Sequence, residues 1–76
     1  MVERLRFDYS KLKGRIVEIC GTQKAFAELL GITEATMTSK LNGYSWFTQE
    51  EIIKSCAILR IGYSEISVYF FTLIVQ

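Results

Sequence analysis

The chain has 76 residues, of which half are hydrophobic, nine are basic, eight are acidic and none is histidine or proline. This length provides for one small domain, which we place over residues 1–76. The high apolar content excludes an intrinsically disordered chain. There is no metal-ligand cluster, glycine-rich phosphate loop or nucleophile–base pair, so we expect neither an enzyme nor a cofactor or small-molecule substrate.

The two cysteines, Cys20 and Cys56, each lie in an apolar helical stripe. Without histidine or a CxxC motif, they are predicted to be reduced core thiols rather than a disulfide or a metal site. The longest apolar-rich run, residues 68–75, is too short to span a bilayer, and the start of the chain lacks the apolar core of a secretion signal. We therefore expect a cytoplasmic protein without membrane contact.

Both ends of the chain carry short strand signals. Leu5, Phe7 and Tyr9 alternate with charged residues, which is the period of a strand. The tail, residues 71–76, is rich in strand-forming residues. The two segments could pair with each other, or the tail could pair with its copy in a second subunit.

The first helix is expected to start at Asp8 or Ser10, either of which could cap it. Gly14 weakens this helix by about 1 kcal/mol relative to alanine, and we interpret it as a site of close helix packing. Gly21 ends the helix and Thr22 caps the next one. The apolar stripe of the first helix consists of Leu12, Ile16, Ile19 and Cys20.

Residues 22–43 have the pattern of two short helices joined at a corner. Gly31 can adopt a positive φ and so end the first of them, and Thr33 can cap the second. A small residue, Ala27, lies where the helices would cross. Apolar residues recur at helical spacing in both segments: Phe26, Leu29 and Leu30 in the first, Met37 and Leu41 in the second. This pattern is typical of a helix-turn-helix.

The clearest local signal follows this motif. Thr48 and Glu51 have the spacing of a capping box, and Phe47 and Ile52 have that of a hydrophobic staple, so a fourth helix should begin at Gln49. Its buried stripe is predicted as Ile52, Ile53, Cys56 and Leu59. We expect Gly62 to stop this helix and Ser64 to cap a short fifth helix, whose inner face contains Ile66, Tyr69 and Phe70.

Within the motif, Gln23, Ala27, Gly31-Ile32-Thr33, Met37 and Leu41-Asn42-Gly43 resemble the helix-turn-helix of the phage Cro and repressor family, also called the XRE family. The wider run, residues 8–71, is similar to small Cro-like regulators of phages and prophages in Gram-positive bacteria. The resemblance implies a mainly α, five-helix lambda-repressor-like domain, to which the terminal strands could add a pair. Lys40 stands where many relatives have an apolar core residue. We expect the neighbouring Leu41 to take over that place in the core.

The resemblance also implies a function: a sequence-specific DNA-binding transcriptional regulator, a Cro-like repressor of double-stranded DNA. The base-reading residues would lie on one strip of the second motif helix, namely Glu34, Ala35, Thr38 and Ser39. Contacts to phosphate would come from Gln23, Lys24, Thr36, Lys40, Asn42 and Tyr44. The plainer interpretation is that these polar side chains are solvated, and Trp46 is more often a core residue than a nucleic-acid ligand.

One reading helix makes too few contacts for tight specific binding, so we expect a homodimer on a pseudo-palindromic operator. The apolar tail is the candidate dimer interface, through Phe71, Leu73 and Val75, although the tail could equally pack on its own core. The net charge of only +1 and the acidic Glu34 motivate a second hypothesis. In it, the same fold is a protein-interaction module that binds a partner repressor through the apolar tail and acts as an antirepressor.

Overall fold

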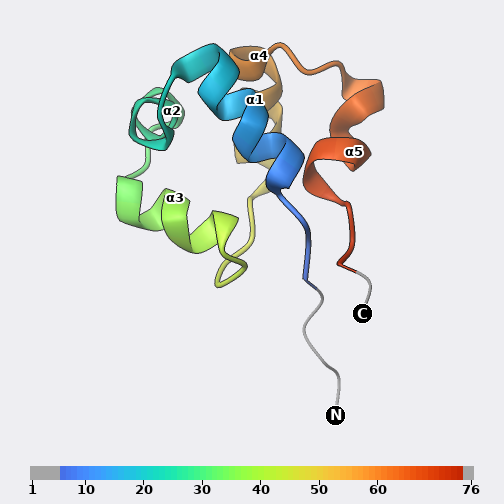
Figure 1. Cartoon of the computed structure of the whole chain (residues 1–76). Coiled ribbons are helices and arrows are strands. Elements are labelled where there is room, and N and C mark those ends of the chain that lie inside the picture. Colours follow the sequence, from blue (N-terminus) through green and yellow to red (C-terminus); the bar gives the residue numbers. More distant parts are fainter. Residues whose placement is uncertain (1–5, 75–76) are drawn as a thin grey trace.

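The computed structural model describes residues 6–74 and is an all-helical domain. Its elements are α1 (Ser10–Cys20), α2 (Gln23–Leu30), α3 (Glu34–Leu41), α4 (Gln49–Leu59), a 3-10 turn (Tyr63–Glu65) and α5 (Ile66–Phe70). Helix α1 runs through the middle of the molecule, with α2 and α3 on one side and α5 on the other (Figure 1). The prediction of a mainly α domain with five helices is confirmed. Within residues 6–74, no helix is long and apolar enough to cross a membrane.

The core lies where α1 meets the other helices, because each helix turns one apolar stripe inward. Fully buried side chains come from every α-helix and include Leu12, Ile16, Phe26, Met37, Leu59 and Phe70. Helix α1 contacts α2, α4 and α5, and α2 contacts both α3 and α4. The α2–α3 pair rests on the core through α2 and through Met37 and Leu41 of α3, and the opposite side of α3 is uncovered.

Three helix starts follow the predicted threonine caps. The side chains of Thr22, Thr33 and Thr48 each accept a hydrogen bond from the amide three residues later, at 3.0–3.1 Å. At α4 the capping box is complete, because the Glu51 carboxylate accepts a bond from the Thr48 amide at 2.9 Å. The start of α1 is different: Asp8 accepts bonds from the amide and the hydroxyl of Ser10, at 2.9 and 2.6 Å.

The end of α4 corrects the sequence prediction. The helix stops at Leu59, and Arg60, not Gly62, adopts the left-handed conformation, with φ of 57°. The guanidinium of Arg15 donates hydrogen bonds to the carbonyls of Leu59 (2.8 Å) and Arg60 (3.1 Å), which satisfies the free end of the helix. Ser64 lies inside the 3-10 turn and forms no capping bond.

Three further predictions about burial are wrong. Leu29 and Ile53 are 64% and 47% exposed, and Ala27 and Ser55 occupy the buried positions of α2 and α4 instead. A methyl group built on Gly14 would meet no atom within 4 Å, so this glycine does not mark a close helix contact. Periodicity identified the helices but assigned one exposed residue to the apolar stripe of α2 and one to that of α4.

The terminal segments meet, although no strand forms within residues 6–74. Phe7 and Leu73 form an isolated antiparallel bridge. Its hydrogen bonds run from the Asp8 amide to the Thr72 carbonyl (2.7 Å) and from the Ile74 amide to the Arg6 carbonyl (3.0 Å). The predicted pairing of the two ends is thus present as a single bridge. Leu5, Val75 and Gln76 lie outside the described residues.

Candidate functional site on the α2–α3 pair

The α2–α3 pair is built by a sharp three-residue turn. Gly31 adopts a left-handed conformation, and its amide donates to the Ala27 carbonyl at 2.9 Å, which ends α2. Helix α3 starts at Glu34 and buries Met37 and Leu41. Because Ala27 is a small buried residue, the two helices can approach closely at this point.

The outer face of α3 carries the four residues predicted to read bases. Glu34, Ala35 and Thr38 are exposed, and Ser39 is half-buried. The strip therefore stands clear of the folded body, as the helical spacing predicts. Exposure alone does not assign it to DNA, because any partner surface could meet the same strip.

Lys40 departs from the sequence prediction. It is 7% exposed, and its ammonium group lies 2.9 Å from the Glu51 carboxylate and donates to the Trp46 carbonyl at 2.8 Å. The same group lies 5.8 Å from the centre of the Phe47 ring. Lys40 and Leu41 are therefore both buried, but only Leu41 belongs to the hydrophobic core, as predicted, whereas Lys40 is buried in an ion pair. The Lys40 charge holds the loop after α3 onto the start of α4 and is buried within the domain.

Glu51 is the partner in this arrangement. Burial by itself would raise the pKa of its carboxyl group, but the hydrogen bond from the Thr48 amide and the nearby Lys40 ammonium outweigh that effect and lower the pKa. The Glu51 carboxylate thus has two structural tasks, as a cap for α4 and as the counter-ion of Lys40. The sequence showed only the first of them.

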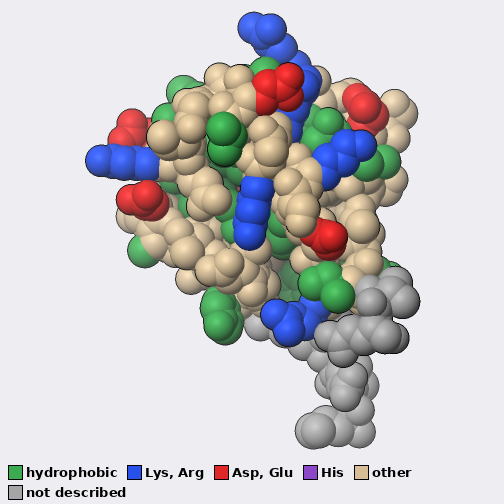
Figure 2. Space-filling model, viewed as in Figure 1, with side chains coloured by type: hydrophobic (Ala, Val, Ile, Leu, Met, Phe, Trp, Pro, Cys, Tyr) green, Lys and Arg blue, Asp and Glu red, His purple; other side chains and the backbone are tan. Residues whose placement is uncertain are grey.

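The other predicted phosphate ligands do not form a cationic surface. Lys24 is an exposed cation, Gln23 is half-buried, and Thr36, Asn42 and Tyr44 are exposed and uncharged. The Thr36 hydroxyl accepts a hydrogen bond from Thr33 at 2.9 Å. With Lys40 paired, the exposed charges of residues 23–42 are one positive (Lys24) and two negative (Glu28 and Glu34), which leaves a net charge of −1. Among the coloured residues of Figure 2, basic and acidic side chains are interspersed without a continuous basic surface.

The predicted dimer interface lies beside an aromatic cluster at the chain ends. The Phe7 ring packs edge-on against Trp46 and Phe71, with ring centres 5.5 and 5.9 Å apart. Phe71 and Leu73 are each 50% exposed, and Leu73 bridges to Phe7. The tail therefore packs partly on its own chain, which was the alternative considered from the sequence. The third predicted interface residue, Val75, is outside the described part of the chain.

A comparison with solved structures found a phage protein. The chain is similar to the modulator of repression of the temperate bacteriophage TP901-1 from Lactococcus lactis, with 42% identity and a TM-score of 0.76 over 86% of this chain and 88% of that one. The main functional prediction, a Cro-like repressor that binds its operator directly as a dimer, is wrong in the light of this similarity. The alternative of a module that acts on a partner repressor agrees with it better.

No curated protein matches the chain. The family comparison covers almost the whole domain: residues 5–73 match the model described as a protein of unknown function (DUF739). The chain belongs to this family.

Proposed function

We propose that this protein modulates repression by binding a partner repressor. The observation that carries the proposal is the 42% identity, over most of both chains, to a modulator of repression from a temperate phage. Two features of the α2–α3 pair support it. Its exposed charges sum to −1, and Lys40, which was predicted to contact phosphate, is buried in an ion pair with Glu51. A surface of this kind repels DNA phosphates.

The outer face of the α2–α3 pair is the proposed contact surface. We consider the pair a helix-turn-helix of the phage repressor type whose exposed side meets protein instead of DNA. A repressor holds DNA phosphates with lysine and arginine, so its DNA-binding surface is positively charged. Glu28 and Glu34 complement such a surface, and the exposed Leu29 and Ala35 supply apolar contact between them. Binding there would cover the repressor surface that occupies the operator.

The test begins with a search of the genomic neighbourhood for a phage-repressor gene and continues with a binding titration of this protein against its product. The wild-type chain should bind the repressor, release it from operator DNA and leave operator DNA unshifted when added alone. Glu34→Lys should weaken repressor binding by about tenfold, which corresponds to ~1.4 kcal/mol, because it places a positive charge against a positive surface. Raising the salt concentration should weaken the wild-type complex as well.

The matched control is Glu65→Lys, which makes the same charge change in the 3-10 turn before α5 and should leave repressor binding unchanged. Leu73→Glu tests the apolar tail, which the sequence suggested as the docking surface. Loss of binding with Leu73→Glu but not with Glu34→Lys would show that the repressor contacts the tail and not the α2–α3 pair. Specific operator binding by the wild-type protein alone would contradict the proposed function.

A further inference from the structure

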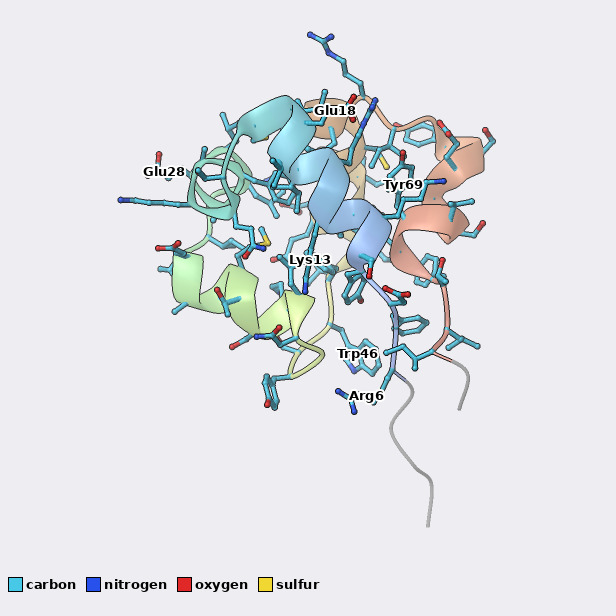
Figure 3. All side chains as sticks on the ribbon, in the orientation of Figure 1. Arg6, Lys13, Glu18, Glu28, Trp46 and Tyr69 are labelled. Carbon is cyan, nitrogen blue, oxygen red and sulfur yellow. The ribbon has the colours of Figure 1, made fainter. Side chains whose placement is uncertain are left out.

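A groove lies beside the start of α1, away from the exposed strip of α3. Residues 6–10, Lys13 and the turn after α3 enclose a cavity of about 210 Å³. Leu41 and Ile74 contribute apolar lining. A second hollow shares Arg6, Asn42 and Gly43 with the first and is also lined by Tyr44. Figure 3 shows Lys13 pointing from α1 toward the end of α3, and Arg6 beside Trp46.

One wall of this groove is an open backbone edge. The bridge between Phe7 and Leu73 takes its hydrogen bonds from the flanking residues, so Phe7 and Leu73 form a non-hydrogen-bonded antiparallel pair. In such a pair the N–H and C=O groups of each residue point away from the partner strand. Within residues 6–74, the backbone of Phe7 forms no hydrogen bond. An extended segment could therefore add to this edge and pair with Phe7.

The charges around the groove favour an acidic occupant. Arg6 is exposed and Lys13 is half-buried, and neither forms an ion pair with a carboxylate of the described residues. Asp8 is the one acid in the described lining; its carboxylate accepts two hydrogen bonds from Ser10 and also interacts with the Lys13 charge, so the described lining carries a net charge of +1. A lining with two cations and one carboxylate attracts a further carboxylate from outside the chain.

We propose that this groove binds an extended acidic segment of the partner repressor. The segment would pair with the backbone of Phe7, place a carboxylate between Arg6 and Lys13, and pack an apolar side chain against Leu41 and Ile74. The identity of the partner rests on the proposed function. The groove begins at Asn42 and Gly43, directly after α3, so one repressor could contact the outer face of α3 and the groove together.

The first experiment uses a peptide probe and does not need the repressor. Isotope-labelled protein is titrated with the acetylated and amidated hexapeptide Val-Glu-Val-Glu-Val-Glu and, in parallel, with its Val-Lys counterpart, while amide chemical shifts are followed by NMR. The acidic peptide should shift the amides of Phe7, Lys13 and Gly43 and slow hydrogen exchange at Phe7. Arg6→Glu and the double variant Arg6→Glu/Lys13→Glu should abolish these changes. Lys24→Glu/Lys54→Glu, which reverses two exposed cations elsewhere, should retain them.

The second experiment measures repressor affinity with the same variants. Arg6→Glu, an exposed substitution, should lower the affinity at least about tenfold. Lys54→Glu alone is the control here, because Lys24 lies on the proposed α2–α3 contact surface, and it should lower the affinity less. Equal shifts with both peptides, or unchanged shifts in Arg6→Glu, would overturn the groove assignment. Repressor affinity unchanged by Arg6→Glu would also overturn it and leave the proposed function standing. A wild-type chain that binds the acidic peptide in the groove but not the repressor would support the groove and refute the proposed function.

Discussion

A lysine near the end of a helix is usually solvated or bound to an anion, and Lys40 shows how one carboxylate changes that role. Its ammonium group lies against Glu51, the Trp46 carbonyl and the Phe47 ring, all from the loop and helix that follow α3. A buried charge is stable only when it is paired and hydrogen-bonded. Lys40 therefore connects α3 to α4, and its contribution belongs to the stability of the domain.

The corresponding prediction concerns Lys40→Met, which keeps most of the side-chain volume and removes the charge. It should lower the free energy of unfolding by about 1–3 kcal/mol, because Glu51 loses its counter-ion and the Trp46 carbonyl loses its donor. Urea unfolding followed by circular dichroism measures the change. Lys24→Met is the control, since Lys24 is exposed, and should leave the midpoint within error. An unchanged midpoint in Lys40→Met would mean that the ion pair adds nothing to stability.

At the scale of the helices, Gly14 is a weak point in α1. It lies in the middle of the helix, is exposed, and leaves open space where a methyl group would go. Gly14→Ala should therefore stabilise the domain by about 1 kcal/mol, through higher helix propensity and a less flexible unfolded chain. The measurement is the shift of the thermal unfolding midpoint.

Gly31→Ala is the matched control for this substitution. Gly31 has equally open space around its missing side chain, but its φ is 86°. The same methyl group should destabilise the domain there by about 1 kcal/mol, because left-handed backbone disfavours a side chain. Equal effects of the two variants would contradict the conformational explanation.

The helices themselves could be predicted because their signals are local. A threonine cap depends on an amide three residues away, so Thr22, Thr33 and Thr48 could be identified from spacing alone. The burial of Ser55 could not be predicted, because apolar periodicity does not mark a serine as a core residue, although its hydroxyl is satisfied locally by donating to the Glu51 carbonyl at 2.6 Å. The role of Arg15 could not be predicted either, because this side chain donates to carbonyls 44 and 45 residues further along the chain. The contacts of Arg15 are tertiary, and such contacts leave no periodic pattern.

For the whole molecule, the fold could be predicted from the sequence while the function could not. The residue types of α3 match a DNA-reading helix, and the strip formed by Glu34, Ala35 and Thr38 is exposed as expected. The charges around this strip alter its interpretation. They depend on Glu51, which pairs with Lys40 eleven positions earlier and neutralises its charge. The groove of Arg6 and Lys13 is likewise invisible in the sequence, because it forms where the chain ends meet the turn after α3.

Acid should destabilise the molecule through two carboxylates. Hydrogen bonds from the Ser10 hydroxyl and amide lower the pKa of Asp8. At Glu51, burial opposes the shift, but bonds from Thr48 and Lys40 still lower the pKa. When a carboxyl group has a lower pKa in the folded chain than in the unfolded chain, the unfolded chain binds protons first as the pH falls. The stabilisation is thus complete above the ordinary carboxyl range, about pH 5, and is lost as the pH drops through the folded-state values.

Glu51→Gln tests this dependence, because glutamine can retain the capping bond but cannot titrate. The variant should unfold at lower urea than wild type at neutral pH, and the difference should shrink between about pH 6 and about pH 3, since only the wild type loses an ionised Glu51. Glu50→Gln is the control: Glu50 is an exposed neighbour whose surface ion pair with Lys54 contributes little, so its pH profile should follow that of wild type. A difference between Glu51→Gln and wild type that stays constant with pH would show that Glu51 acts through its hydrogen bonds and not through its charge.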